Sequence, residues 1–115
     1  MVGNIKELEK HIVNHPSAFN AAMKVLVSPS DGWEGYVMRV VEVEVDGFTP
    51  KHNHPWPHIN YFIEGNGELM IDGEVNKVEA GSFAFVPGDA LHQFRNKGKN
   101  VFKFICIVPE EGHKI

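Results

Sequence analysis

The sequence has a single cysteine, Cys106, and no apolar run long enough to span a bilayer. One cysteine excludes an intramolecular disulfide framework and fits a reducing compartment. The first ten residues, MVGNIKELEK, are charged early and lack the apolar core of a secretory signal. A cytoplasmic protein is therefore the expectation.

The chain also lacks an excess of positive charge. It has 11 Lys and Arg against 15 Asp and Glu, a net charge of −4 at pH 7. This balance gives no electrostatic reason to expect nucleic acid or an anionic membrane as a partner. The 115 residues, 43% of them hydrophobic, suffice for one domain with a hydrophobic core.

Helical patterns are scarce. Only residues 4–13, NIKELEKHIV, place apolar side chains at helical intervals, behind Asn4 as an N-cap and ahead of Pro16. A short helix is predicted there, within an N-terminal segment of residues 1–20. From residue 21 onward the chain consists of short β-branched or aromatic stretches bounded by Gly, Pro, Asp or Asn. Residues 21–115 are therefore predicted to form an all-β sandwich or barrel, whose closure removes open edges.

The segment YVMRVVEVEV places one charge on an otherwise apolar strand face. That face is predicted to be buried, and its residues are Val37, Arg39, Val41, Val43 and Val45. A buried charge costs several kcal/mol unless it is paired or hydrated. Two interpretations are therefore open: Arg39 either extends to solvent near a strand end, or it lies in a hydrated cavity that uses a cation.

The last apolar stretch, VFKFICIVP, has a similar two-sided pattern. Lys103 marks one face as the exterior, so Phe104 and Cys106 are predicted to face the interior. Cys106 is then either a small buried hydrophobe or an oxidisable thiol on a cavity wall.

Three of the seven histidines, His52, His54 and His58, fall within KHNHPWPHINYF. His52 and His54 share a face if the chain is extended there, although an isolated pair of this kind can also point to solvent. The prolines favour a turn that brings His58 back toward His54. With His92 from PGDALHQFRN, these imidazoles would form a sulfur-free metal site inside a barrel. The remaining histidines, His11, His15 and His113, are expected on the surface.

Two stretches resemble the two motifs of the cupin superfamily. They are residues 47–65, GFTPKHNHPWPHINYFIEG, and residues 81–96, GSFAFVPGDALHQFRN. The matching positions are His52, His54 and Gly65 in the first, and Gly81, Pro87, His92 and Asn96 in the second. The resemblance covers about residues 25–109. It implies a single-domain cupin, a jelly-roll barrel of the double-stranded β-helix type.

The departures from these motifs indicate which group of cupins the chain resembles. The spacer between Gly47 and His52 is one residue short, and Asp89 stands where the second motif has glycine. His58 occupies the position of the usual glutamate. The chain therefore resembles the small single-domain cupins that bind a metal, often manganese, through four histidines. This implies His52, His54, His58 and His92 as ligands.

The same resemblance assigns neighbours to the metal. FICIVPEEG is similar to the C-terminal strand of those proteins, which implies Phe104 and Cys106 beside the ion and favours the hydrated cavity for Arg39. Asn60 shares parity with His58 along the following stretch and is expected to lie behind it as a hydrogen-bond donor. The predicted substrate pocket is therefore Arg39, Asn60, Phe104 and Cys106.

A ligand set of four neutral imidazoles leaves the divalent charge uncompensated, which favours Lewis acidity and an anionic ligand. Ligand type does not fix the metal, since imidazole accepts Mn, Fe, Co, Ni, Cu and Zn.

The first functional hypothesis is a redox-metal oxidoreductase, dioxygenase-like, acting on a small anionic or aromatic compound. The second is a non-catalytic module that binds metal or a small ligand, and the third is a barrel whose histidines bind nothing. The resemblance also implies a homodimer. AAMKVLVSP is the segment expected to cover a strand edge across its interface.

Overall fold

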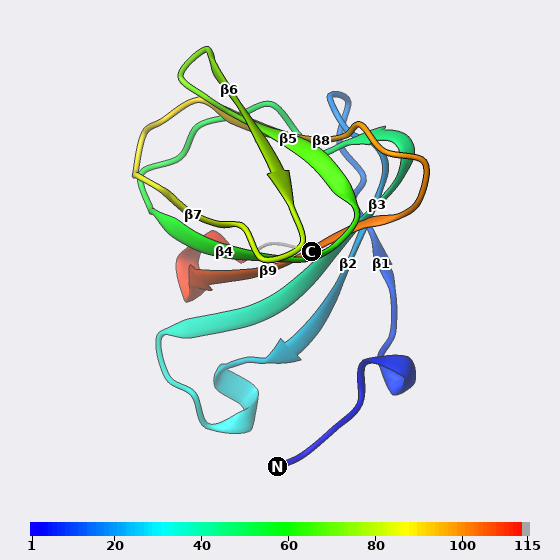
Figure 1. Cartoon of the computed structure of the whole chain (residues 1–115). Helices are drawn as coiled ribbons and strands as arrows, with labels where there is room; N and C mark the ends of the chain where they lie inside the picture. Colours follow the sequence, from blue (N-terminus) through cyan, green and yellow to red (C-terminus); the bar gives the residue numbers. More distant parts are fainter. Residues whose placement is uncertain (114–115) are drawn as a thin grey trace.

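This computed structural model describes residues 1–113 (Figure 1). They contain nine β-strands and three short 3-10 helices, joined by turns and loops. The strands are β1 (His11–Ile12), β2 (Phe19–Val27), β3 (Tyr36–Phe48), β4 (His58–Glu64), β5 (Asn66–Ile71), β6 (Glu74–Glu79), β7 (Phe83–Val86), β8 (His92–Asn96) and β9 (Phe102–Pro109). The 3-10 helices are η1 (Ile5–Glu7), η2 (Pro29–Asp31) and η3 (Glu110–Gly112).

The strands form one antiparallel sheet that curls into a nearly closed barrel. Its order is β6-β5-β8-β3-β9-β4-β7, with β2 paired to β3 and β1 paired to β2. β3 is the longest strand and joins both halves, pairing with β8 at Phe48 and with β9 from Tyr36 to Val43. The all-β barrel predicted from the turn-bounded segments is confirmed.

The N-terminal segment is less helical than its spacing predicts. The helix is the single turn η1, where the Asn4 side chain accepts a hydrogen bond from the Lys6 amide at 2.9 Å. Farther on, His11 and Ile12 pair with β2, because strand pairing overrides a weak local helical pattern. Within residues 1–113, no helix is long and apolar enough to cross a membrane.

An aromatic cluster fills the barrel. Phe62, Phe102 and Phe104 are each at most 1% exposed, and Phe94 stacks on Phe104 with ring centroids 4.2 Å apart. Fully burying one such side chain contributes about 1.5–3 kcal/mol, so this cluster is a main source of stability.

The valine face of β3 is buried as predicted at Val37, Val41 and Val43. Val45, on the same face by parity, is 41% exposed. The pairing with β9 ends at Val43 opposite Phe102, so the strand beyond it leaves the core.

Candidate metal centre

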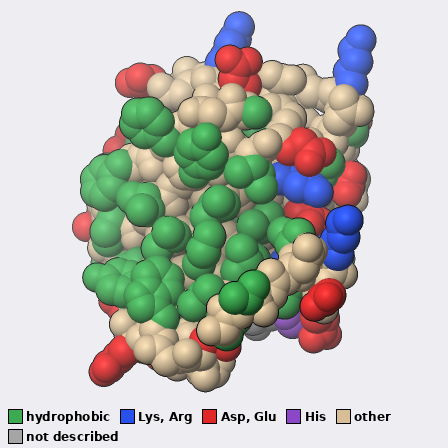
Figure 2. Space-filling view, turned by 60° about the horizontal axis from the view of Figure 1, so that its bottom comes forward, with side chains coloured by type: hydrophobic (Ala, Val, Ile, Leu, Met, Phe, Trp, Pro, Cys, Tyr) green, Lys and Arg blue, Asp and Glu red, His purple; other side chains and the backbone are tan. Residues whose placement is uncertain are grey.

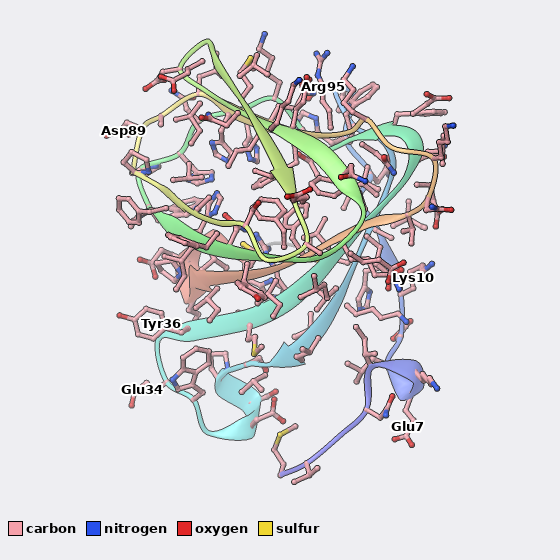
Figure 3. All side chains as sticks on the ribbon, in the orientation of Figure 1. Glu7, Lys10, Glu34, Tyr36, Asp89 and Arg95 are labelled. Carbon is pink, nitrogen blue, oxygen red and sulfur yellow. The ribbon has the colours of Figure 1, made fainter. Side chains whose placement is uncertain are left out.

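Backbone hydrogen bonds join two loops at one end of the barrel, near Asp89 (Figure 3). The amides of His52 and His92 each donate to the other's carbonyl, at 3.2 and 3.0 Å. The Asp89 amide donates to the His54 carbonyl at 2.6 Å. The loop that carries the HxH pair is thereby held against the loop before β8.

The second motif is built for this close approach. A side chain at Gly88 would collide with the Pro55 carbonyl oxygen, so only glycine lets the two loops meet there. Asp89 has a φ of 68°, in the left-handed region that glycine prefers and aspartate tolerates. Asp89 can therefore occupy the position where the motif has glycine.

The structure brings all four predicted histidines together. His52, His54 and His92 each offer a ring nitrogen, and these nitrogens lie within 4.8 Å of one another. His58 enters from β4, with its Nε2 atom 3.2 Å from Nε2 of His92. Side chains from two distant stretches of chain thus meet at one point.

Hydrogen bonds fix which nitrogen of three rings carries the proton. Nδ1 of His54 lies 2.7 Å from the Trp56 carbonyl, and Nδ1 of His92 lies 2.9 Å from the Ala90 carbonyl. A carbonyl only accepts, so in each neutral ring Nδ1 donates and Nε2 keeps a free lone pair.

Asn60 sets the same tautomer in His58. Its Nδ2 donates to the Ile105 carbonyl at 3.2 Å, which turns Oδ1 toward Nδ1 of His58 at 2.8 Å. Asn60 is 4% exposed and lies behind His58, as expected. Towards His58 it is a hydrogen-bond acceptor and not the predicted donor, because its Nδ2 donates to the Ile105 carbonyl.

Burial favours the neutral form of His52, His58 and His92. It lowers the pKa of His58 from its ordinary 6.5 to about 3, with His92 acting in the same direction and the Asn60 hydrogen bond opposing it. Burial and the same neighbour lower the pKa of His52 to about 4, and burial also lowers the pKa of His92. Neutral imidazole is the form that binds metal ions.

The donor set fits a divalent transition-metal ion. With the Nδ1 protons of His58 and His92 directed elsewhere, two Nε2 lone pairs face each other across 3.2 Å. Two acceptors at hydrogen-bond distance repel unless a cation lies near both. An all-nitrogen set suits Mn, Fe, Co, Ni, Cu or Zn better than Mg or Ca, which prefer oxygen.

Arg39 is an interior cation without a counterion. Its guanidinium contacts only weak or neutral acceptors: Cys106 Sγ at 3.7 Å, Met23 Sδ at 3.9 Å and His113 Nδ1 at 3.3 Å. Its Nε atom is buried without a hydrogen-bond partner, and no carboxylate of residues 1–113 forms an ion pair with it. Of the two interpretations, this arrangement disfavours escape to solvent, because the guanidinium contacts groups of the interior.

The expectation that His113 lies on the surface is wrong. Its ring is partly buried against Arg39. Burial is the larger cause that lowers the pKa of His113, and the positive charge of Arg39 is a smaller one. The chain reaches this place through η3, the 3-10 turn that directly follows β9 and precedes His113.

The remaining pocket residues are placed differently. Cys106, 3% exposed, lies beside Arg39, whereas Phe104 lies in the aromatic core behind Phe94. The ring that meets the histidines is Phe94, with centroids 6.2 Å from His58 and 6.3 Å from His92.

Sequence reasoning missed Phe94 and Trp56 as neighbours of the histidines. Trp56 stacks on His54, with ring centroids 4.9 Å apart and an angle of 11° between the ring planes. The sequence contained a feature that could have indicated each position. Phe94 shares strand parity with His92, and Trp56 stands between two prolines next to the HxH pair.

A curled antiparallel sheet with histidine-bearing loops at one end is the architecture of a cupin. A sequence model of the family described as "Cupin domain" matches residues 39–108, which is more than half of the chain. The chain therefore belongs to the cupin family.

Several known proteins are similar to it. The polyketide cyclase RemF from Streptomyces resistomycificus superposes with a TM-score of 0.89 at 27% identity, over 96% of this chain and 79% of RemF. A 1-methylthio-D-xylulose 5-phosphate methylsulfurylase from Rhodospirillum rubrum is 26% identical over 84% of this chain, which spans 61% of that protein. A predicted oxalate decarboxylase from Thermotoga maritima, 19% identical over 95% of this chain and 98% of its own, shares the fold with a TM-score of 0.86.

Proposed function

We propose that the chain binds one divalent transition-metal ion, with manganese as the first candidate, through His52, His54, His58 and His92. The observation that carries the proposal is the pair of Nε2 atoms, 3.2 Å apart, whose rings direct their protons to Asn60 and Ala90. These partners preset the free lone pairs, so little reorganisation is needed on binding.

The proposed activity is that of an oxidoreductase, dioxygenase-like, on a small anionic or aromatic compound. When bound, the ion supplies Lewis acidity and a redox couple. Arg39 binds the anionic group of the compound through its planar fork, and Phe94 offers an apolar wall on the histidine side. The relative from Rhodospirillum rubrum is named for a phosphate ester, which is an anion, and this supports the anionic class.

Oxygen consumption tests the activity. We expect protein loaded with Mn²⁺ or Fe²⁺ to consume oxygen with at least one member of a broad panel of carboxylates and catechols. Metal-loaded protein that consumes none across the panel contradicts the dioxygenase proposal and leaves metal binding itself untouched.

A second candidate function is a non-catalytic binding module. Within residues 1–113, no carboxylate forms a hydrogen bond or ion pair with the four histidines, so an acid–base residue is missing from their immediate contacts. Such a module binds a carboxylate in calorimetry without consuming it, whereas rapid turnover of any substrate excludes it.

The Arg39→Met variant should bind oxalate at least about tenfold more weakly than wild type, because a hydrogen bond to a charged group contributes about 1.5–3 kcal/mol. Arg39→Lys retains the positive charge but loses the planar guanidinium group, so its oxalate affinity should lie between those of wild type and Arg39→Met. Calorimetric titration of oxalate into metal-loaded protein measures the effect. Equal oxalate affinity in Arg39→Met and wild type would remove Arg39 from the binding site.

The Asn60→Leu variant should bind Co²⁺ about 10–100-fold more weakly, the usual cost of losing the hydrogen-bond partner of a ligating histidine. Asn60→Asp keeps an acceptor for Nδ1 of His58 and should retain most of the affinity. Titration of Co²⁺ followed by its visible absorption measures both, and thermal melts of the apo forms check the fold. Equal losses in the two variants would show that the acceptor is not what matters.

A further inference from the structure

The chain that follows β9 contacts two parts of the candidate site. A side chain at Gly112 would collide with the indole of Trp56, so the backbone of η3 lies directly against that ring. Trp56 is the ring that stacks on one of the proposed metal ligands. One residue farther on, Nδ1 of His113 lies 3.3 Å from Nη1 of Arg39. The C-terminal segment, residues 110–113, thus touches both the loop with the HxH pair and the interior cation.

Backbone hydrogen bonds hold the C-terminal segment in this place. The Glu110 amide donates to the Gly35 carbonyl at 2.9 Å, which ties the segment to the residue before β3. The His113 amide donates to the Glu110 carbonyl at 3.0 Å and closes the turn. The backbone of His113 is therefore fixed by the fold, even though it lies beyond the last strand.

The contact between His113 and Arg39 has a defined direction. A guanidinium has five N–H donors and no acceptor, so Nδ1 of His113 accepts and the neutral ring carries its proton on Nε2. Burial, the charge of Arg39 and His11 on β1 all lower the pKa of His113, which favours this neutral form. The other acceptors that the guanidinium contacts are sulfur atoms, which are weak. Within residues 1–113, His113 is thus its one nitrogen or oxygen acceptor.

These contacts leave one edge of the guanidinium for a ligand. His113 and Met23 both contact Nη1, whereas Nη2 has only the Cys106 contact and the buried Nε has no partner. Two neighbouring N–H groups of an arginine match the two oxygens of a carboxylate. Arg39 lies opposite Cys106, and Cys106 lies opposite Asn60, in one row across β3, β9 and β4. The arginine therefore shares a row with the residue that supports the proposed metal centre.

The outer side of the sheet is poor in groups able to pair with Arg39. Figure 2 shows a largely hydrophobic outer side, with charged side chains at its margin. Outward-facing residues of β4, such as Ile59 and Tyr61, are apolar or aromatic and each 49% exposed. An anion that pairs with Arg39 is therefore expected on the inner side of the sheet, where the histidines lie.

We propose that His113 is a positioning residue, which holds Arg39 so that Nε and Nη2 bind the anionic group of the ligand. This inference rests on the proposed function, in which Arg39 recognises that anion. Without the acceptor, the guanidinium gains rotational freedom that it must lose again on binding. His113 lies outside residues 39–108, the range that matches the family model, so family membership does not imply this role.

Two substitutions separate the acceptor of His113 from its volume. His113→Leu removes the acceptor, whereas His113→Asn places a carbonyl oxygen near the position of Nδ1. In calorimetric titrations of the metal-loaded protein, His113→Leu should bind oxalate about three- to tenfold more weakly, the cost of ordering one flexible side chain. His113→Asn should bind it like wild type, and so should the exposed control His15→Leu. Adding His113→Leu to Arg39→Met should cause no further loss, because the two residues act as one unit.

NMR of the apo protein labelled with ¹⁵N-arginine measures the contact without metal or anion. The chain has two arginines, Arg39 and Arg95, so Arg39→Met assigns the signals. The Nη protons of Arg39 should give separate signals in wild type and His113→Asn, because the hydrogen bond restricts rotation of the guanidinium. They should average in His113→Leu. Circular dichroism should show an unchanged fold in both variants, since the substituted residue follows the last strand.

The outcomes distinguish this inference from the proposed function. Averaged Nη signals in wild type overturn the role of His113. Full oxalate affinity in His113→Leu, or equal losses in His113→Leu and His113→Asn, overturns it as well. If Arg39→Met still loses affinity in those cases, the proposed anion site remains. Equal oxalate affinity in wild type and Arg39→Met overturns the anion site and this inference together.

Discussion

Replacing His92 with alanine abolishes stoichiometric metal binding. His92 is the one predicted ligand from the second histidine-bearing stretch, and its ring lies 4.9–5.0 Å from the rings of His52, His54 and His58. Its removal opens the centre of the cluster. We expect a loss of Mn²⁺ and Co²⁺ affinity larger than the about 10–100-fold cost of losing a supporting hydrogen bond. Calorimetric titration and elemental analysis of protein purified without added metal measure it.

His15→Ala is the matched control. His15 is exposed and its ring hydrogen-bonds to Ser17, so the variant should bind metal like wild type. His58→Ala separates four ligands from three, because His52, His54 and His92 remain in place. It too should lose affinity, and His58→Asp should recover part of it. Unchanged metal content in His92→Ala would contradict the assignment.

Replacing Gly65 with alanine lowers the free energy of unfolding by about 3 kcal/mol or more. Gly65 has a φ of 87°, and a side chain there would collide with the Val101 carbonyl oxygen. The left-handed conformation costs alanine about 1–2 kcal/mol, and displacing the Val101 backbone adds to it. Since domains of this size are stable by about 5–15 kcal/mol, the effect is large. Urea denaturation monitored by tryptophan fluorescence measures it.

Gly73→Ala isolates the backbone component of this effect. Gly73 has a similar φ of 83°, but an added side chain would meet nothing within 4 Å. Its variant should lose only the about 1–2 kcal/mol of conformational strain. If Gly65→Ala were no less stable than Gly73→Ala, the close packing of the turn between β4 and β5 would be unimportant.

Strand parity predicted much of the barrel correctly. The position of Lys103 placed Phe104 and Cys106 inside, and both are buried. The spacing of the two motifs predicted the meeting of His58 and His92, which a sequence separation of 34 residues would otherwise conceal. Such patterns succeed because a strand alternates its side chains strictly between two faces.

The predictions that failed depend on how elements meet. Val45 is exposed because β9 begins at Phe102, opposite Val43, and does not extend along the rest of β3. His113 is partly buried because its ring lies against Arg39. Phe94, not Phe104, contacts the histidines because it follows His92 on the same strand face.

X-ray absorption spectroscopy of the cobalt-loaded protein tests the central claim most directly, because it counts the imidazoles around the ion. The account predicts scattering from four imidazoles in wild type and from three in any His58→Ala protein that retains cobalt. Fewer than three imidazoles in wild type, or the same number in both proteins, would contradict the proposal that these two stretches of chain share one ion.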